Sequence, residues 1–587
     1  MSLDDANSNL NTIFITTNFQ LMIKPIYVLG TGLSHNGSAV LLKDGKVCVA
    51  IEKERITRIK HDGGNDTLAI QYCLDAEGIT LKDISVVVQC ENFTLPKREN
   101  FKGKRIFADN NQPKIIDITH HLAHAYSAVG TAPFSDCVVI VIDGCGSPLD
   151  QFMSLHPEQK KVVEVLCFEE VLMQCEKDSF YHFDGQKLTS LYKDFSVMNP
   201  AIKSTLTVRA TQHSIGGFYA TISDYVFGNM DDVGKLMGLA PYGNSEDFDF
   251  EVFEFKSSRL FVKADWQHNF NNPSKGYDYF KEHFKYYANV AKWAQEQVEK
   301  AVLDCIKNRL DQFPNKNLCY SGGVALNAVA NAKLVANNWV ENIYIEPAAA
   351  DNGLALGCAF YGWLEYLKMP KIAHDGSTCF GKTYDKKNIE EALKNHTSNY
   401  HKKEFTNEEE LLHYCATQLN DGKIIGWFQS GSEFGPRSLG RRSVLAHPGI
   451  KGMKDHINKN IKFREDFRPF APAVLKEKVS EYFENGSNSP YMILVDKTRK
   501  QYLEQLCNVT HCDGSARVQT VEESWNLKFS KLIQAFYKLS GIAVLLNTSL
   551  NRKGMPIVET PNEALQLFDE TALDVLVIED TVLEKRK

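Results

Sequence analysis

The chain has 587 residues, 43% of them hydrophobic and 24% charged, which is typical of a globular protein with two or more domains. Lysines and arginines number 66 against 73 aspartates and glutamates. The net charge of -7 excludes a general electrostatic attraction to nucleic acid or to an anionic membrane surface. No apolar stretch is long enough to span a bilayer, and the 14 cysteines include no Cys-x-x-Cys pair. We therefore expect a cytoplasmic protein with reduced thiols.

The first part of the chain contains a repeated strand pattern. Residues 1–22 are polar and lack a signal-peptide signature, so we expect them to form a flexible leader. A strand is predicted over 27–30, followed by a hairpin of strands 38–43 and 46–51 around Asp44-Gly45. A second copy is predicted to start with the strand 137–143 and to continue with strands over 152–156 and 162–168. Such duplicated units are typical of the actin and sugar-kinase architecture, in which two related halves enclose a ligand cleft.

Two histidines one helical turn apart, His120 and His124, are candidates for metal ligands. At this spacing both imidazoles leave the same helix face and can close on one ion. Asp143 ends a predicted apolar strand, and Asp351 follows another predicted strand over 343–345. Aspartates at strand ends that face glycine-rich turns suit a cleft better than a core, and a carboxylate at the end of a nearby strand can supply a third ligand. Taken alone, a histidine pair of this kind is more often a surface or core feature.

A glycine turn later in the chain is a candidate phosphate site. After a long helix predicted over 286–309, the strand 318–320 runs into Ser321-Gly322-Gly323 and then into another helix. A strand that leads through such a turn to a helix N-terminus presents free backbone amides to an anion. A simple tight turn is the alternative.

The densest arginine segment follows a predicted interdomain linker over 368–381. Helices predicted over 389–394 and 408–419 and a strand over 423–428 lead into it. Guanidinium groups beside glycine turns bind phosphate oxygens, so the segment predicts a pocket for a polyanion such as ATP. Interleaved phenylalanines indicate partial burial. A solvated basic face and a nucleic-acid surface are the alternatives. The basic residues are Arg437, Arg441, Arg442, Lys462, Arg464 and Arg468.

The ordered set of motifs resembles that of the O-carbamoyltransferases of natural-product biosynthesis, which include the nodulation-factor, cephamycin, ansamycin and tobramycin carbamoyltransferases. The resemblance covers nearly all of the chain from Met22 onward. One departure is Ser438, where the family more often has alanine, a change too small to alter the site. The matching segments are 32–39, 54–60, 120–124, 234–243, 321–323, 434–440, 467–472 and 546–551.

The resemblance implies a two-domain α/β protein. Residues 23–370 would form a metal-binding carbamoyl-transfer domain, similar to tRNA threonylcarbamoyl transferases and duplicated like the actin and sugar-kinase folds. Residues 371–587 would form an α+β, YrdC-like domain. This second domain would make carbamoyl adenylate from carbamoyl phosphate and ATP with Mg²⁺, releasing pyrophosphate and phosphate. The first domain would then transfer the carbamoyl group to a hydroxyl of a small-molecule natural product.

The resemblance also assigns residues to these sites. The metal ligands would be His120, His124, Asp143 and Asp351, with iron (Fe²⁺) as the ion. The adenylate at the transfer site would be contacted by Gly144, Gly322, Gly323 and Asn327. The adenylation site would contain Arg437, Lys462, Arg468, Arg517 and Asn547.

An alcohol is a poor nucleophile at neutral pH, so the transfer site needs a base. His35, in a turn between strands, is the candidate for accepting the hydroxyl proton, and Lys60 for stabilising the oxyanion. The alternative is that both only position the substrate. Asp231 and Asp232 are candidates for binding a cationic group of the acceptor, with simple solvation at the surface as the alternative.

Two other functions stay open. One is a tRNA threonylcarbamoyl-transferase-like enzyme, and the other is a non-catalytic, actin-like ATP-switch protein. The Phe-Gly-Pro-Arg segment fits small-molecule carbamoylation better than the first, and the predicted metal site argues against the second. We expect a small hydroxylated acceptor, no nucleic-acid or membrane partner, and a homodimer as the general prior for the oligomeric state. No motif identifies the acceptor.

Overall fold

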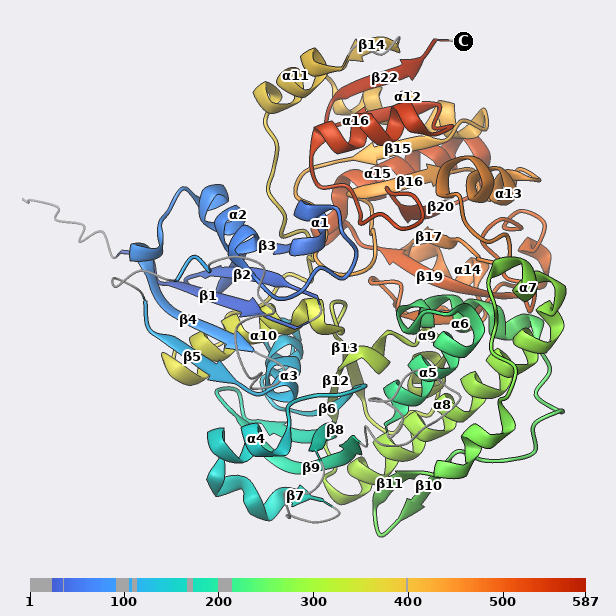
Figure 1. Cartoon of the computed structure of the whole chain (residues 1–587). Coiled ribbons are helices and arrows are strands. Elements are labelled where there is room, and N and C mark those ends of the chain that lie inside the picture. Colours follow the sequence, from blue (N-terminus) through green and yellow to red (C-terminus); the bar gives the residue numbers. More distant parts are fainter. Residues whose placement is uncertain are drawn as a thin grey trace, which may run out of the picture.

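The computed structural model describes residues 24–34, 36–90, 105–107, 113–165, 173–198, 214–396 and 400–586. The predicted leader over 1–22 lies outside the described residues. Three large sheets organise the chain, the first two in its N-terminal part and the third in its C-terminal part (Figure 1). Within the described ranges, no helix is long and apolar enough to cross a membrane.

The first sheet has the strand order β3-β2-β1-β4-β5. β2 pairs antiparallel with β1 and β3, whereas β4 pairs parallel with β1 and β5. The predicted hairpin is confirmed, and both of its turn residues, Asp44 and Gly45, have positive φ angles. The strands are β1 Tyr27–Gly32, β2 Ser38–Lys43, β3 Lys46–Glu52, β4 Ile84–Cys90 and β5 Ile115–Ile118.

The second sheet repeats this topology. Its order is β13-β12-β6-β8-β9-β7, with β6 antiparallel to β8 and parallel to β12. The predicted duplication of the actin and sugar-kinase type is therefore confirmed by the strand order itself. The strands are β6 Cys137–Ile142, β7 Val163–Glu164, β8 Met173–Phe183, β9 Leu188–Met198, β12 Asn317–Ser321 and β13 Asn342–Ile345.

The second hairpin was predicted in the wrong place. Residues 152–155 belong to the helix α4 Leu149–Leu155, and only the short β7 lies in the predicted strand 162–168, of which 166–168 are outside the described residues. The hairpin consists instead of β8 and β9. β8 contains the consecutive charged residues Glu176, Lys177 and Asp178, all buried. Charges inside a strand break the apolar alternation by which strands are predicted, which explains the error.

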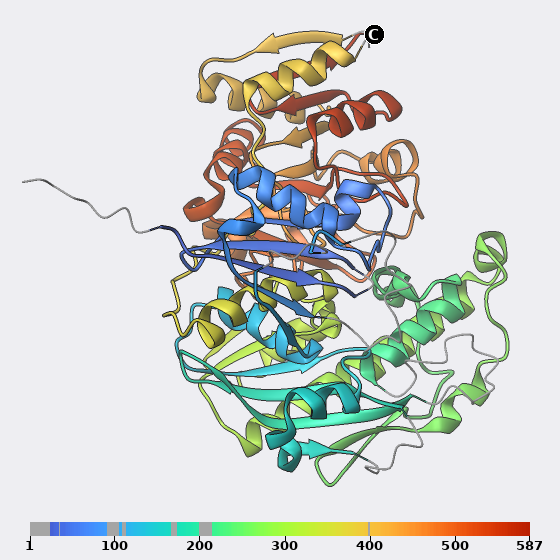
Figure 2. The same cartoon turned by 60° about the vertical axis from the view of Figure 1, so that its left-hand side comes forward.

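Helix α3, His120–Thr131, lies between the first two sheets, packed against α10, Leu354–Tyr361 (Figures 1 and 2). Every residue of α3 is buried. The predicted long helix is confirmed as α8, Phe284–Gln312. The other helices of this half are α1 Lys53–Thr57, α2 Thr67–Glu77, α5 Ile215–Phe227, α6 Val233–Leu239, α7 Tyr277–Glu282 and α9 Ala328–Ala336; β10 Phe253–Lys256 and β11 Arg259–Val262 form a separate hairpin.

The C-terminal part is built on a mixed nine-stranded sheet of order β14-β22-β21-β15-β16-β20-β17-β19-β18. Helices α12 and α15 pack against each other beside it. The strands are β14 Tyr400–Glu404, β15 Ile425–Phe428, β16 Arg442–Ala446, β17 Ala471–Leu475, β18 Leu494–Lys497, β19 Ser515–Val521, β20 Val544–Ser549, β21 Val575–Ile578 and β22 Thr581–Lys585. The helices are α11 Lys386–Asn395, α12 Glu408–Asn420, α13 Met453–Ile457, α14 Val479–Tyr482, α15 Glu523–Ser540 and α16 Pro561–Glu570.

Gly357 sets how closely α10 approaches α3. A Cβ atom at this position would lie 1.7 Å from the carbonyl oxygen of Ala123, a backbone atom of α3. We predict that Gly357→Ala lowers the melting temperature by several degrees, because overpacking costs about 1–3 kcal/mol and the backbone has little room to yield. Differential scanning fluorimetry measures this. Gly234→Ala in α6, where the added methyl meets nothing within 4 Å, is the control, and an equal loss in both variants would contradict the packing argument.

Candidate functional site

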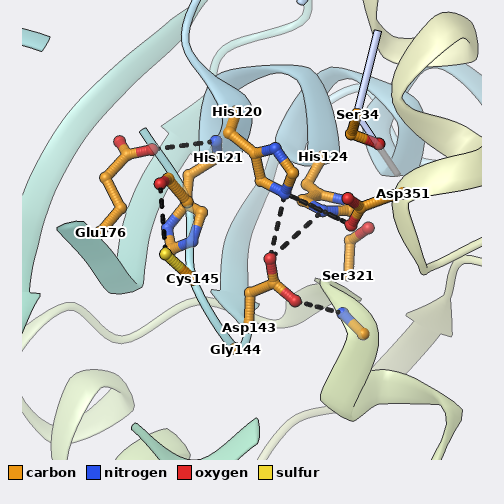
Figure 3. A network of polar contacts seen from close by, with 12 residues as sticks. Ser34, His120, His121, His124, Asp143, Gly144, Cys145, Glu176, Ser321 and Asp351 are labelled. Atoms are coloured by element: carbon orange, nitrogen blue, oxygen red, sulfur yellow. Dashed lines mark hydrogen bonds and ion pairs between the residues drawn. The ribbon is translucent and has the colours of Figure 1, made fainter. Parts of the chain in front are cut away.

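Four ligand atoms meet at the N-terminus of α3. His120 and His124 lie one turn apart, and their Nε2 atoms are 3.1 Å from each other. Asp143 directly follows β6, and its Oδ2 lies 3.0 Å from His120 Nε2. Asp351 begins a 3₁₀ turn after β13, and its Oδ1 lies 3.4 Å from the same nitrogen. Figure 3 shows the four side chains pointing toward one another.

The geometry of this cluster fits a metal ion. All four ligand atoms lie within 4.8 Å of one another, and all four residues are buried. Ligands placed about 2.1 Å from one ion lie about 3.0–3.4 Å apart in octahedral or tetrahedral arrangements, close to the separations at His120. Two imidazoles and two carboxylates are a donor set suited to a first-row transition ion. The four residues predicted as ligands are therefore brought together by the fold.

Charge within the cluster is unevenly shared. Burial disfavours a charged imidazole, but Asp351 and Asp143 outweigh it and raise the pKa of His120 well above its usual value. Burial and the neighbouring His120 lower the pKa of His124 to about 4. Burial alone would raise the pKa of Asp143, yet the contact with His120 holds it below its usual range. The two carboxylates therefore favour a positive charge between them, which is the electrostatic condition for holding a cation.

The glycine turns lie directly beside the ligands. Gly322 has a φ of +93°, and a Cβ there would lie 2.3 Å from Ile142 O, so only glycine fits. The next amide, Gly323 N, donates to Asp143 Oδ1 at 3.1 Å. Gly144 approaches the start of α5, where Ser214 Oγ donates to its carbonyl at 2.6 Å. The structure therefore places the three glycines predicted to contact the adenylate around Asp143.

Asn327, which is predicted to contact the adenylate, has a structural role in the fold. Its Oδ1 accepts a hydrogen bond from Ala330 N at 3.1 Å and so caps α9. Its amide also exchanges hydrogen bonds with Gln295 at 2.9 and 3.1 Å. Because the side chain is engaged in this way, the residue fixes the helix that follows the Gly-Gly turn.

A second cluster, in the C-terminal part, is strongly cationic. Burial and Arg468 lower the pKa of Arg437 to about 10. Burial and three neighbouring arginines, Arg437, Arg464 and Arg468, lower the pKa of Arg517 well below its usual value. The buried Nε atoms of Arg437 and Arg517 have no hydrogen-bond partner among the described residues. Guanidinium groups stay protonated, so their mutual repulsion and unused donors indicate a site for an anion.

Lys462 and Asn547 line the same region. The ammonium group of Lys462 donates to the carbonyl oxygens of Ser549 and Asn551, at 2.7 and 2.8 Å. Burial, Arg464 and Arg468 together lower the pKa of Lys462 well below its usual value. Asn547 Nδ2 donates to Ser438 O at 3.1 Å, while its buried Oδ1 has no partner among the described residues. Arg464 was recognised in the sequence only as part of the basic run, and its electrostatic effect on Arg517 and Lys462 adds it to this site.

The comparisons with known proteins agree over both halves. The family model described as Carbamoyltransferase N-terminus matches residues 28–95 and 98–360, and the model described as Carbamoyltransferase C-terminus matches residues 416–585. The chain belongs to the carbamoyltransferase family. It is an enzyme of the carbamoyltransferase class, and this favours carbamoyl transfer over both alternative functions.

Named relatives cover most of this carbamoyltransferase. The nodulation protein NolNO of Sinorhizobium fredii is 29% identical over 94% of this chain and 79% of that protein. The 3'-hydroxymethylcephem-O-carbamoyltransferase of Amycolatopsis lactamdurans is 25% identical over 93% of this chain and 97% of that enzyme. The crystal structure of HypF from T. kodakarensis aligns with 59% of this chain and 49% of its own, at 14% identity and a TM-score of 0.33.

The remaining predicted site residues lie in different surroundings. His35 falls outside the described residues. Lys60 lies 3.9 Å from Glu54, and its charge contributes to lowering the pKa of Lys462, so it lies toward the cationic cluster. Asp231 is exposed, whereas Asp232 pairs with Lys235 at 2.6 Å and acts electrostatically on Arg468. Lys60 and Asp232 therefore mark where the N-terminal part of the carbamoyltransferase meets the C-terminal cluster.

A buried bridge that sequence reasoning missed connects the two clusters. Gly435 N, in the Phe-Gly-Pro-Arg segment, donates to Glu52 Oε1 at 2.6 Å, and Arg55 Nη2 donates to Gly435 O at 2.8 Å. Asn352 Nδ2, next to the ligand Asp351, donates to the same Glu52 oxygen at 3.4 Å. Only the tertiary structure brings these positions together, since Glu52 and Gly435 are far apart in the sequence.

The buried carboxyl group of Glu346 should make the stability of the protein depend on pH. It borders a cavity of about 10 Å³ that is also lined by His374, Phe434 and Tyr491. Its carboxylate accepts hydrogen bonds from Thr131 Oγ1 at 2.8 Å and Ala348 N at 3.0 Å. Burial outweighs these contacts and raises the pKa of Glu346 to about 7.

Because the folded protein binds this proton more tightly than the unfolded chain, the Glu346 contribution to stability falls as pH rises from about 4.5 to 7, by up to about 1.4 kcal/mol per pH unit. Glu346→Gln should flatten this part of the profile and stabilise the protein above pH 7 relative to the wild type. Urea denaturation between pH 5 and 8 measures it. Glu341→Gln, which changes an exposed carboxylate paired with Lys316, should leave the profile unchanged, and identical profiles for the wild type and Glu346→Gln would refute the assignment.

Proposed function

We propose that the chain is an ATP-dependent O-carbamoyltransferase that forms carbamoyl adenylate in its C-terminal part and transfers the carbamoyl group in its N-terminal part. The domains proposed for these steps are residues 371–587 and 23–370. The observation that carries the proposal is the pairing of two chemically different clusters in one chain. One offers imidazole and carboxylate ligands for a cation, and the other offers arginines with unused donors for an anion.

The cationic cluster suits the activation step. Water displaces phosphate from carbamoyl phosphate, giving carbamate and inorganic phosphate. A carbamate oxygen then attacks the α-phosphorus of ATP, and pyrophosphate leaves with the electrons of the broken bond. Arg437, Arg464, Arg468 and Arg517 hold the phosphate oxygens of both substrates, with Mg²⁺ accompanying ATP, and offset the charge that develops in this step. Lys462 and Asn547 hold the surrounding loops in place.

The metal-binding cluster suits the transfer step. His120, His124, Asp143 and Asp351 would hold an ion, proposed as iron(II), which when bound would act as a Lewis acid toward the carbamoyl carbonyl. The turns that contain Gly144, Gly322 and Gly323 are proposed to let the phosphate of the adenylate approach the backbone beside these ligands. The acceptor hydroxyl oxygen attacks the carbamoyl carbon, its proton passes to a base, proposed as His35, and AMP leaves. Lys60 is proposed to offset negative charge on the reacting oxygens.

The proposed acceptor is a hydroxylated small molecule. The relative 3'-hydroxymethylcephem-O-carbamoyltransferase supports this, since its name gives a hydroxymethyl group as the acceptor. Asp231, which is exposed, and Asp232 are proposed to attract a cationic group of the acceptor. Asp232 would contribute only if the cationic group of the acceptor replaced Lys235 as its partner.

The central experiment measures the two half-reactions separately. Purified protein is supplied with ATP, Mg²⁺ and carbamoyl phosphate, and the release of pyrophosphate is followed with and without the carbamoyl donor. A panel of hydroxylated metabolites is then added, and products are searched by mass for an added carbamoyl group. Donor-dependent pyrophosphate release without any acceptor is the expected result. If pyrophosphate release needs no carbamoyl phosphate, the proposed activation step is wrong.

A pair of variants should separate the two steps. Arg468→Ala should reduce donor-dependent pyrophosphate release about 100-fold or more, because a cation at the reacting phosphates is lost. His35→Asn should abolish carbamoyl transfer while leaving pyrophosphate release intact, because only the transfer step needs that base.

The matched controls are Arg552→Ala, which removes a surface arginine paired with Glu570 at 3.1 Å, and His413→Asn, on an exposed position of α12. Both should keep both activities. Equal loss of the two activities in His35→Asn would reject its role as the base.

A further inference from the structure

The helix that carries both histidines has no cap of its own. Its N-cap residue, Thr119, makes no side-chain capping hydrogen bond. Instead, His120 N donates to Ser147 Oγ at 3.0 Å, and His121 N donates to Glu176 Oε2 at 3.2 Å. The first two amides of α3 are therefore satisfied from a loop and a strand that come later in the chain. Figure 3 shows the contact between His121 N and Glu176.

The same oxygen of Glu176 also holds the loop that carries Asp143. Ser147 N donates to Glu176 Oε2 at 3.1 Å. On either side, Gly146 N donates to Glu176 O at 2.8 Å and Glu176 N donates to Ser147 O at 3.0 Å. One carboxylate thus contacts both elements that supply the closest pair of ligands, His120 and Asp143.

Glycine at position 146 permits this close contact. A Cβ there would lie 2.6 Å from His121 Cδ2 and 2.9 Å from Glu176 Cβ. The loop after Asp143 therefore lies directly on the His121 ring and the Glu176 side chain. A larger residue would push the loop away from α3.

Glu176 is itself outside the group of metal ligands, and its charge is balanced elsewhere. It forms a fully buried ion pair with Lys193 of β9. Lys193 also donates to Ser179 Oγ at 3.2 Å, and that hydroxyl contacts His121 Nδ1 at 2.7 Å. A buried ion pair seldom adds stability beyond what apolar residues would give, so its presence beside the ligands calls for another explanation.

We propose that Glu176, supported by Lys193, is the positioning residue of the metal centre, and that it fixes His120 against Asp143 by holding α3 and the loop 143–147 together. This inference rests on the proposed metal site. The positive end of the helix dipole disfavours a cation at the N-terminus of α3. The carboxylate of Glu176, which lies at this N-terminus, offsets that effect. Residues of this kind typically affect metal affinity about 10–100-fold.

The test uses Co²⁺ as the probe, because its visible absorption reports ligand geometry. In the full chain, Glu176→Gln should raise the Kd for Co²⁺ about 10–100-fold and alter the Co²⁺ spectrum, since the amide keeps the size but loses the charge. Donor-dependent pyrophosphate release by the C-terminal part should stay at the wild-type level.

Asp194→Asn is the matched control. Asp194 is an equally buried carboxylate of the same hairpin, paired with Lys177 at 3.0 Å and Arg259 at 2.7 Å. Both variants should lower the melting temperature, but only Glu176→Gln should lose Co²⁺ affinity. Equal losses of affinity, or an unchanged Kd and spectrum in Glu176→Gln, would overturn the positioning role.

Ser147→Ala gives a second, milder probe if Glu176→Gln does not fold. It removes only the acceptor of His120 N, and a several-fold rise in the Co²⁺ Kd is expected, with no rise overturning the inference. If the wild-type protein binds no Co²⁺, the metal centre and the role of Glu176 are both wrong. If the wild-type protein binds Co²⁺ but transfers no carbamoyl group, only the proposed function is wrong.

Discussion

Two buried carboxylates that follow strands β6 and β13 of the second sheet set the main electrostatic constraint on the N-terminal part. Asp143 and Asp351 lie beside His120 with little access to water. In such surroundings like charges repel strongly unless a positive charge lies between them. The duplicated topology, the burial of α3 and the glycine turns all serve to hold these groups within ligand distance of one another.

The C-terminal part presents the opposite arrangement. Burial and neighbouring arginines lower the pKa of both Arg437 and Arg517. Glu465 lies 3.7 Å from Arg468 and also pairs with Lys553 and Lys235. The cluster of the N-terminal part therefore favours a cation, and the cluster of the C-terminal part favours anions. Such a division suits a reaction whose first substrates are rich in phosphate and whose second step needs a polarised carbonyl.

Local patterns predicted the elements that carry the ligands but not the contacts that hold them. The spacing of His120 and His124 and the Gly322-Gly323 turn are encoded in short segments, and the fold brings them together as expected. The second hairpin was misplaced because Glu176, Lys193 and their neighbours put charges inside strands. Pairings such as Glu52 with Gly435 join distant segments, and no single-sequence pattern encodes them.

Three contacts between the N-terminal and the C-terminal part depend on the backbone of the C-terminal part. Arg58 donates to the carbonyl oxygens of Pro556 and Ile557, both at 2.7 Å, and Arg55 donates to that of Gly435. All three acceptors belong to the main chain, which every amino acid supplies. These three acceptors do not depend on which side chains stand at positions 435, 556 and 557, whereas the contacts of Arg58 with Glu563 and of Tyr72 with Glu559 across the same surface require particular side chains in both parts.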